Sequence, residues 1–393
     1  MIPQKEMMEM KGSKIVMFWL IGLVMLVTSC EDGDLGALND PKDKKEVEYT
    51  WAATADSMQE STINIYLSSQ GTFRENNEGN EFFHYWRNAH MVDVLVDGYL
   101  RSGEQDYITR AKTLLLGIKS RNNGRYPNDF IDDMAWLAIA CTRAYEVSDD
   151  ELFLDVSKLL WEENLKYWSD VYGGGITWKV NTPNLKNAVS NAPVAILSLR
   201  LYAIENDTKY LDWAKDIYAW QKNTLVDPAT GLVWDHIDLV DGEVVVKKDW
   251  VFTYNMGTWI GAATELYQVT GEQSYLNDAI KSANSMMTSP KLTSEGLLRD
   301  EGQGDGGLFK GILVRYFTRL IELPDLNEDR RQDYIEFMRF NGETLYEDGI
   351  ARPSMLCGPN WRSTPGGVVD FSTQLSGIML IEAMARLEEG DFL

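Results

Sequence analysis

Apolar residues recur at intervals of three and four along almost the whole chain from residue 50 onward, with breaks at clusters of Gly, Pro and Asn. This spacing places the apolar side chains on one face of a helix. The pattern predicts about twelve helices, with ends defined to within a few residues. They cover residues 52–69, 85–101, 104–118, 130–147, 150–167, 187–205, 207–224, 252–270, 273–287, 306–323, 328–345 and 367–389.

A degenerate internal repeat groups these helices in pairs. Aromatic residues near the start of alternate helices lie 46 to 65 residues apart, at Tyr107, Phe153, Tyr210, Tyr275 and Tyr334. A repeat of this length indicates stacked helical hairpins that share one core. The helices that begin with these aromatics carry more charge, whereas the alternate ones are richer in small and apolar residues. We therefore predict an all-α fold, an (α/α)6 toroid of six hairpins with an inner and an outer ring.

Acidic residues outnumber basic ones, with 60 Asp and Glu against 37 Lys and Arg in 393 residues. The net charge of −23 argues against nucleic acid as a partner, because phosphate binding requires clustered Lys and Arg. It also argues against electrostatic adhesion to anionic lipid. A composition of 44% apolar residues can bury a large core, so the acidity is not that of a disordered tail.

The N-terminus resembles a bacterial lipoprotein signal peptide. Lysines precede an apolar run over residues 15–27, which is too short to cross a bilayer as a helix. The segment Val27-Thr28-Ser29-Cys30 resembles a lipobox, in which the cysteine thiol receives the lipid. We predict a signal peptide at residues 1–29 and lipidation of Cys30. An ordinary signal peptide with a coincidental cysteine is the alternative.

Residues 30–49 are polar and charged, and we expect them to form a flexible tether to a folded domain at residues 50–393. Acidic residues directly after Cys30 resemble the surface-export signal of Bacteroidota lipoproteins. This resemblance favours an outer membrane lipoprotein on the cell surface over one facing the periplasm. Membrane contact is then expected only through the lipid anchor.

The other cysteines and the histidines show no spacing typical of a metal site. Cys141 lies in an apolar helical segment and Cys357 in a loop, and they can form one disulfide or remain buried thiols. His84, His90 and His236 belong to no HExxH motif. These features argue against zinc chemistry and against a Ser-His-Asp triad.

Two adjacent carboxylates, Asp132 and Asp133, are the sharpest candidates for chemistry. Cleavage of a glycosidic bond requires one carboxylic acid and one carboxylate on either side of the anomeric carbon. In the first turn of a helix both can face one cavity, and their repulsion would raise one pKa. A structural role is also open, since acidic residues complement the dipole at a helix N-terminus. In a toroid the long loops gather over the N-termini of the inner helices, where we expect the site.

The segment from Phe130 to Trp136 (FIDDMAW) resembles the Asp-Asp motif of glycoside hydrolase family 76, the endo-α-1,6-mannanases. The resemblance covers about residues 51–389, and Met256 stands where many members have Gln. Further matches follow in the family's order at residues 174–178, 253–257, 260–262, 266–276, 309–316 and 366–376.

This resemblance implies an (α/α)6 fold and no metal or organic cofactor. It also implies that Asp132 is the nucleophile and Asp133 the general acid/base of a retaining double displacement, although the sequence leaves open which residue takes which role. Mannan has many hydroxyls and apolar ring faces, which suit aromatic, amide and carboxylate side chains. Trp136 and Trp259 are expected to pack between helices and not to contact substrate. The candidates for substrate binding, each with a structural role as the alternative, are Trp178, Asn191, Tyr254, Asn255, Asp305, Lys310 and Trp361.

Residues 50–393 are therefore expected to be the catalytic domain of a monomeric, endo-acting α-1,6-mannanase that hydrolyses the backbone of α-mannan with retention. One alternative is a retaining transglycosidase on mannan-type glycans, because a sugar hydroxyl can capture the same covalent intermediate as water. The other is a glycan-binding surface lipoprotein without catalysis, against which the intact aspartate pair speaks.

Overall fold

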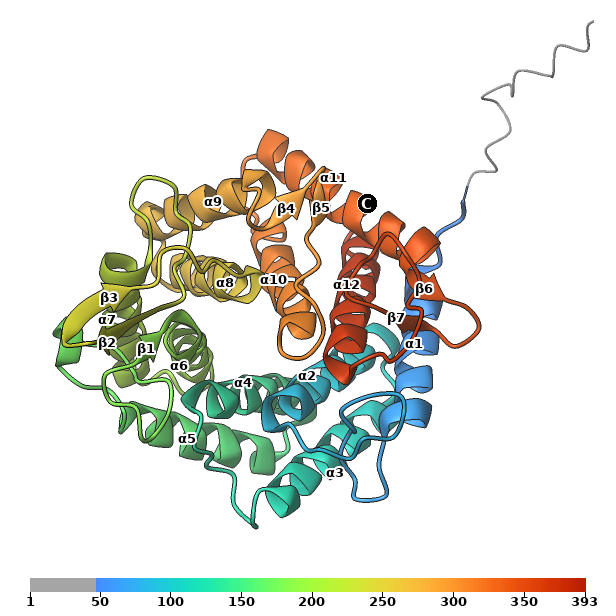
Figure 1. Cartoon of the computed structure of the whole chain (residues 1–393), viewed down its shortest axis with the longest axis horizontal. Helices are drawn as coiled ribbons and strands as arrows, with labels where there is room; N and C mark the ends of the chain where they lie inside the picture. The colour runs from blue at the N-terminus through green and yellow to red at the C-terminus, as the bar shows by residue number, and fades with distance from the viewer. Residues whose placement is uncertain (1–46) are drawn as a thin grey trace, which may run out of the picture. The chain divides into compact units, whose positions relative to one another are not determined.

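Figure 1 shows helices arranged as two concentric rings. The computed structural model describes residues 47–393, and Tyr49–Leu393 form one compact unit. The signal peptide, Cys30 and most of the tether lie outside the described residues, so these features and the domain boundary at residue 50 stay predictions. Within residues 47–393 there are twelve α-helices, as the apolar spacing predicts, and the (α/α)6 toroid is confirmed.

The inner ring closes on itself, because each of its helices packs against the next and the last packs against the first. These helices are apolar over most of their circumference, as expected for elements covered on all sides. They are α2 (Tyr85–Ser102), α4 (Ile131–Ser148), α6 (Ala192–Glu205), α8 (Thr253–Thr270), α10 (Gly306–Ile321) and α12 (Phe371–Glu389).

The outer ring consists of the more charged helices, each buried along one face only. Most of them pack against the inner helix that precedes them in the chain, and the first outer helix packs against the last inner one. The outer helices are α1 (Trp51–Tyr66), α3 (Gln105–Arg121), α5 (Glu151–Leu165), α7 (Thr208–Leu225), α9 (Gln273–Thr288) and α11 (Glu328–Thr344).

Two inner helices begin later than their apolar spacing predicts. Helix α6 begins at Ala192 instead of residue 187, because residues 186 and 187 pair as a strand with residues 236 and 237. Pro193, in the first turn of α6, lacks an N–H and suits that position. Helix α12 begins at Phe371 instead of residue 367, because its first N–H donates to the Glu75 carbonyl oxygen at 2.8 Å. In both cases a partner distant in sequence sets the boundary.

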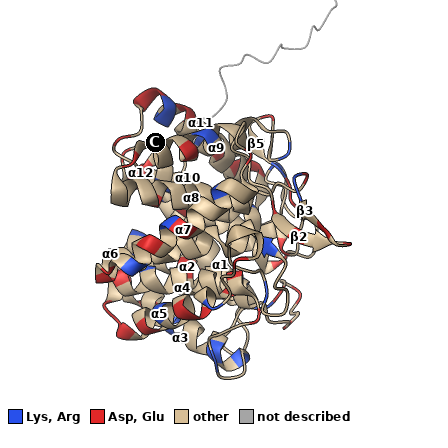
Figure 2. Cartoon of the chain, turned by 90° about the vertical axis from the view of Figure 1, so that its left-hand side faces the viewer, with Lys and Arg blue, Asp and Glu red and all other residues tan. Residues whose placement is uncertain are grey.

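Short strands were not predicted, and they lie mainly at one end of the ring. Figure 2 shows the β2–β3 hairpin projecting there, and acidic residues distributed along many of the visible helices and loops. No helix within residues 47–393 is both long enough and apolar enough to span a membrane. The strands are β1 (Lys186–Asn187), β2 (His236–Val240) and β3 (Glu243–Val246) in one antiparallel sheet, and the pairs β4 (Thr293–Ser294) with β5 (Leu297–Leu298) and β6 (Ile350–Ala351) with β7 (Leu356–Cys357).

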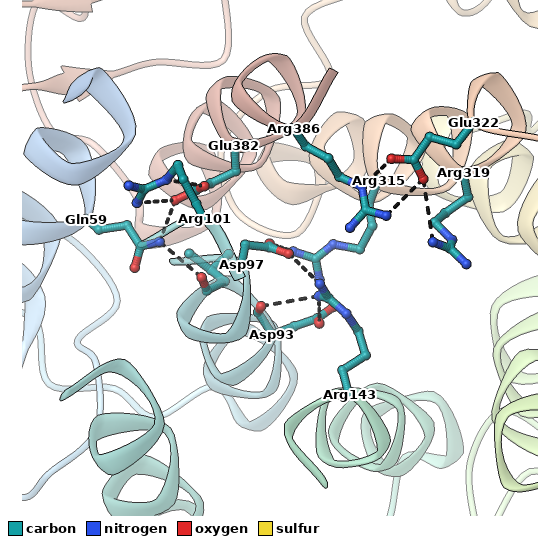
Figure 3. A network of polar contacts seen from close by, with 11 residues as sticks. Gln59, Asp93, Asp97, Arg101, Arg143, Arg315, Arg319, Glu322, Glu382 and Arg386 are labelled. Atoms are coloured by element: carbon teal, nitrogen blue, oxygen red, sulfur yellow. Dashed lines mark hydrogen bonds and ion pairs between the residues drawn. The ribbon is translucent and has the colours of Figure 1, made fainter. Parts of the chain in front are cut away.

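Ion pairs join the C-terminal halves of the inner helices (Figure 3). Arg143 of α4 and Arg315 of α10 both contact Asp93 and Asp97 of α2. Three other arginines of this region, Arg101, Arg319 and Arg386, lie in the last turns of α2, α10 and α12, where they complement the partial negative charge of the unpaired carbonyl groups. The same region contains a second cavity of about 490 Å³, lined by charged side chains of both signs. The arginines that line this cavity are paired with carboxylates, so ion pairs connect the inner helices at this end of the toroid.

Candidate active site

Residues at or before the N-terminal ends of α2, α4, α6, α8 and α10 line a cavity of about 600 Å³. The long loops gather at this end, which is where the sequence pattern predicts the site. The wall combines aromatic rings with carboxylates, a composition that suits a sugar ligand. It is formed by residues 82–86 before and in α2, by residues 121, 122, 128 and 130, by 132, 133 and 136 of α4, by 178, 185, 187 and 189, by 235, 236, 238 and 250, by 254 of α8 and by 305 and 309 at α10.

Asp132 and Asp133 both line this cavity from the first turn of α4. Phe130, directly before the helix, has an extended backbone and forms an antiparallel bridge with the segment that follows Trp178. The Ile131 N–H donates to the Trp178 carbonyl oxygen at 3.0 Å. These contacts fix the start of α4, so the first-turn geometry that lets adjacent carboxylates face one cavity is present.

Burial and neighbouring negative charge favour the protonated state of this pair. Burial raises the pKa of Asp132 to about 7; the charges of Asp305 and Asp235 contribute to the rise, and backbone N–H groups of the first turn oppose it. Burial, followed by the charge of Asp132, raises the pKa of Asp133 well above its usual range. Near neutral pH the pair therefore retains at least one proton. One acid and one carboxylate are what glycosidic cleavage requires.

The pH dependence of the enzyme should follow from these shifts. We expect kcat/KM to fall below about pH 7, where Asp132 takes up a proton, and to fall again at higher pH, where Asp133 loses its proton. Because the pKa of Asp132 rises from 3.8 on folding, its contribution to stability is complete below about pH 4 and is lost as the pH rises through about 7. Kinetic and melting profiles between about pH 4 and 10 measure both effects. In an Asp132→Asn variant the melting temperature should fall less as the pH rises. A kcat/KM profile whose acidic limb lies near pH 4 would contradict the prediction.

Asp235 is a third buried carboxylate in the cavity, and sequence analysis did not select it. Its Oδ1 accepts hydrogen bonds from Asn255 Nδ2 at 3.0 Å and from the Tyr254 hydroxyl at 3.2 Å. Its Oδ2 lies 2.7 Å from His236 Nδ1, and its N–H donates to the Trp250 carbonyl oxygen at 3.0 Å. The carboxylate is therefore held in one orientation and can accept hydrogen bonds from sugar hydroxyls.

Asp305, a predicted substrate-binding residue, lies at the cavity rim directly before α10. Its side chain is 68% exposed, and its Oδ1 lies 3.2 Å from Nη2 of the buried Arg87. Arg87 also lies 4.0 Å from Glu75, whose carboxylate is 3.2 Å from His84 Nε2. Arg87 therefore orients the Asp305 carboxylate and leaves it accessible. This position supports the prediction that Asp305 binds substrate.

Trp178 and Tyr254, also predicted to bind substrate, both line the cavity. Trp178 meets the Phe130 ring edge to face at 5.1 Å, and Tyr254 stacks on Phe309 at 3.9 Å. These contacts fix the two rings before any ligand arrives. Trp136 is largely buried between helices, as expected, but it also reaches the cavity wall.

Asn191 and Asn255 are fully buried and do not line the cavity. The Asn191 amide donates to the carbonyl oxygens of Ile176 and Asn187 and accepts from the Ile176 N–H at 2.8 Å. It thereby joins the segment before Trp178 to the start of α6. Asn255 acts on the site through Asp235. The structure does not support the predicted direct contact of either asparagine with substrate.

Lys310 and Trp361 are also buried away from the cavity, at 1% exposure each. Lys310 Nζ donates to the Pro359 carbonyl oxygen at 2.6 Å and lies 3.8 Å from the centre of the Trp361 ring. Burial lowers the pKa of Lys310 to about 8. The pair holds the loop at 359–361 against α10 through a cation–π contact, so here the structural alternative fits better than substrate binding.

The glycine-rich segment before Trp178 has a structural role. Gly174 and Gly175 adopt φ values of 134° and 90°, and a Cβ on Gly175 would lie 2.4 Å from the Trp220 ring. The buried Lys186 ammonium donates to three backbone carbonyl groups between residues 169 and 174. This tight loop delivers Trp178 to the cavity wall.

The cysteines are not bonded to each other, and no metal site is evident in the described part of the chain. Cys141 and Cys357 are both buried as free thiols. Among residues 47–393, no group of three or more His, Cys, Asp or Glu side chains is placed to hold a metal ion.

Most aromatic residues of the wall were missed in the sequence. Four of them lie at residues 82–86, directly before and at the start of α2, and Trp250 lies shortly before α8. Once inner helices are distinguished from outer ones, a position directly before an inner helix places a residue at the cavity end of the toroid. That criterion would have selected Phe82 and Trp250.

Comparison with known proteins agrees with this geometry. The sequence model of glycosyl hydrolase family 76 matches residues 50–389. The GH76A α-1,6-mannanase from Salegentibacter sp. HEL1_6 is 58% identical, with a TM-score of 0.85 over 86% of this chain and 99% of that one. An inactive variant of it, with two adjacent aspartates changed to Asn, was solved with α-1,6-mannotriose and is 57% identical, with a TM-score of 0.84 over 86% of this chain and 99% of that one. The mannan endo-1,6-α-mannosidase DCW1 of Candida glabrata is 25% identical over 75% of this chain and 71% of its own length. The chain belongs to glycosyl hydrolase family 76.

Proposed function

We propose that this glycoside hydrolase is an endo-acting α-1,6-mannanase that cleaves the backbone of α-mannan with retention. The observation that carries the proposal is the pair Asp132 and Asp133, both facing the cavity and together retaining a proton near neutral pH. Similarity to an α-1,6-mannanase at 58% identity supports the choice of substrate.

Asp132 acts as the nucleophile and Asp133 as the acid/base. Asp132 attacks the anomeric carbon while Asp133 protonates the departing glycosidic oxygen, so the bond to the leaving sugar breaks as a mannosyl ester forms. Asp133, now ionised, then removes a proton from a water molecule that attacks the same carbon and releases Asp132. Two inversions leave the product in the α configuration.

The surroundings of the pair suit both steps. Burial keeps the proton on Asp133 until the leaving oxygen takes it. Asp235 and Asp305 place negative charge around the site, which stabilises the positive charge that develops on the sugar ring. Exposed side chains at the rim, including Asp305, leave the cavity accessible to a chain that continues beyond it, as endo action requires.

The position of Asp132 and Asp133 in the cavity distinguishes them from a second pair of adjacent aspartates. Residues 47–393 contain a second pair of adjacent aspartates, Asp149 and Asp150, at the opposite end of α4. There Asp150 caps α5 and contacts Lys112, a structural role. The related mannanase is inactive when two adjacent aspartates are replaced, which supports a catalytic role for the pair in the cavity.

Product analysis tests the proposal. Early in the reaction, linear α-1,6-mannan should yield oligosaccharides of mixed length, and NMR should show the α-anomer before mutarotation. Mannose alone from the start would indicate exo action, and an initial β-anomer would indicate inversion. Products longer than an oligosaccharide substrate would indicate transfer, and binding of mannan without reducing ends would indicate a binding protein. Each of these results would overturn a stated part of the proposal.

We also propose that the enzyme is a monomer anchored to the outer membrane by lipid on Cys30 and exposed at the cell surface. The lipobox-like segment and the acidic residues that follow it support the lipid anchor and the surface location. A Cys30→Ala variant should move from the membrane fraction to the soluble fraction, and protease added to intact cells should remove the wild-type protein. Retention of the variant in membranes would contradict lipid anchoring.

A further inference from the structure

Two aromatic rings in the cavity wall are largely exposed. Phe82 is 61% exposed and Trp250 is 46% exposed, whereas other rings of the wall, such as Trp136, are buried or stacked on neighbours. An exposed ring adds little to the stability of the fold, because its apolar face remains in water. A ligand that covers this face would remove from water the apolar area that folding alone leaves exposed, and this burial would favour binding.

The two rings lie on opposite sides of the opening. Phe82 precedes α2 and Trp250 precedes α8. The inner ring runs in the order α2, α4, α6, α8, α10, α12 and then closes, so α2 and α8 are three positions apart in either direction. Asp132 and Asp133 begin α4, which lies between them on one side. A chain that crosses the cavity past the aspartates can therefore reach one ring at each end.

Local contacts hold Phe82 in place. Its N–H donates to Asn80 Oδ1 at 3.0 Å, and its ring lies 4.8 Å from the His84 ring. The preceding Glu81 carbonyl oxygen accepts from Arg121 Nη2 at 3.0 Å. Because the loop is fixed without a ligand, little conformational freedom is lost when a ligand covers the ring.

Trp250 is held directly to the catalytic wall. Its carbonyl oxygen accepts the Asp235 N–H at 3.0 Å, and its ring meets the His236 ring edge to face at 5.6 Å. The Lys247 ammonium lies 5.5 Å from the centre of the same ring. One sugar chain can therefore extend from Asp235 onto the Trp250 ring.

We propose that Phe82 and Trp250 are platforms for mannosyl units on opposite sides of the scissile bond, and that they set both the preference for long chains and the position of cleavage. The inference rests on the proposed function. The C–H face of a pyranose packs on an aromatic ring through apolar burial and weak C–H contacts. A platform on each side holds a long chain across the aspartates, whereas a short chain reaches at most one of them.

The position of cleavage gives the sharpest test. Mannohexaose labelled at its reducing end is incubated with the full-length wild type, with Phe82→Ala and with Trp250→Ala, and the labelled products are sized. Removal of one platform should shift binding toward the remaining one, so the two variants should move the main cleavage site in opposite directions along the hexaose. For each variant, the ratio of kcat/KM for mannooctaose to that for mannotetraose should fall about tenfold, as expected for loss of one ring contact.

Phe340 provides a matched control, since it is an exposed aromatic residue of α11 outside the cavity wall. Phe340→Ala should leave the cleavage position and the length ratio as in the wild type. Unchanged cleavage position in both cavity variants, shifts in the same direction, or an equal loss on short and long chains would each overturn the inference. If the wild type fails to cleave any α-1,6-mannan, the proposed function itself is wrong, which is a different result.

Discussion

Asp132→Asn and Asp133→Asn are each expected to lower kcat/KM on α-1,6-mannan at least about 10³-fold. An amide at position 132 cannot form the covalent mannosyl ester, and an amide at position 133 cannot protonate the departing sugar. Both variants should remain folded, because burial raises the pKa of both carboxyl groups and an amide removes the cost of charging them. Initial rates of reducing-sugar release, together with circular dichroism and thermal melting, measure the two effects.

An aryl α-mannoside with a good leaving group should separate the two roles. Such a substrate needs no proton from the enzyme, so the variant that lacks the acid/base should still form the covalent intermediate and should be accelerated by azide to a product of retained configuration. The variant that lacks the nucleophile cannot give this product by the same route. We expect the retained mannosyl azide from Asp133→Asn, and formation of it by Asp132→Asn would reverse the assignment.

Asp149→Asn is the matched control for these substitutions. It alters one member of the adjacent pair outside the cavity, at a position with φ of 54° that asparagine tolerates. Its activity should equal that of the wild type within about twofold, since the residue lies far from the chemistry. If Asp132→Asn or Asp133→Asn retains activity within about tenfold of the wild type, the altered carboxylate is not part of the catalytic machinery.

Gly257→Ala is expected to destabilise the fold by about 3 kcal/mol, although alanine is normally the better helix former by about 1 kcal/mol. A Cβ on Gly257 of α8 would lie 2.5 Å from the Leu313 Cα of α10 and 3.0 Å from the Leu313 backbone nitrogen. No rotamer change can relieve a clash with backbone atoms, so one inner helix must move within a closed, densely packed ring. Chemical and thermal unfolding of the full-length protein measure the loss.

A graded series keeps this prediction testable if Gly257→Ala fails to fold. A Cβ on Gly261 would lie 2.4 Å from the Tyr316 ring, a side chain that can shift, so Gly261→Ala should cost less. A Cβ on Gly366 would meet no atom within 4 Å, and its φ is not positive, so Gly366→Ala should be nearly neutral. Equal stability of the three variants, or a Gly257→Ala variant more stable than the wild type, would show that the helices are not packed as closely as the structure has them.

Periodicity alone predicted the scaffold. Helix formation depends on neighbours three and four positions apart, so the apolar spacing predicts the twelve helices. The aromatic repeat predicts how they pair. The exceptions are the starts of α6 and α12, where pairing of residues 186 and 187 with β2, and contacts of residues 369 to 371 with residues 75 to 77, override the local pattern. Such partners are distant in sequence and leave no periodic trace.

Only some residues of the site could be predicted from the sequence. The adjacent aspartates were identified by their resemblance to a family motif, and Trp178, Tyr254 and Asp305 do reach the same cavity. Amide, ammonium and indole groups, however, bind sugars and satisfy buried backbone groups with the same donors and acceptors. The Asn191 side chain hydrogen-bonds to backbone groups of Ile176 in this structure. No feature of its local sequence distinguishes that role from ligand binding.

The sequence by itself therefore determined the helices, the hairpin repeat and the acidic pair, because each depends on residues close together in the chain. Tertiary structure alone decided which polar and aromatic side chains face the cavity and which are buried. It brought Asp235 and Trp250 from the loops around β2 and β3 to the cavity of the α4 aspartates, and it set Phe82 and Trp250 at the N-terminal ends of α2 and α8, three inner helices apart. The physical reason is closure of the ring, which makes neighbours of helix ends that are far apart along the chain.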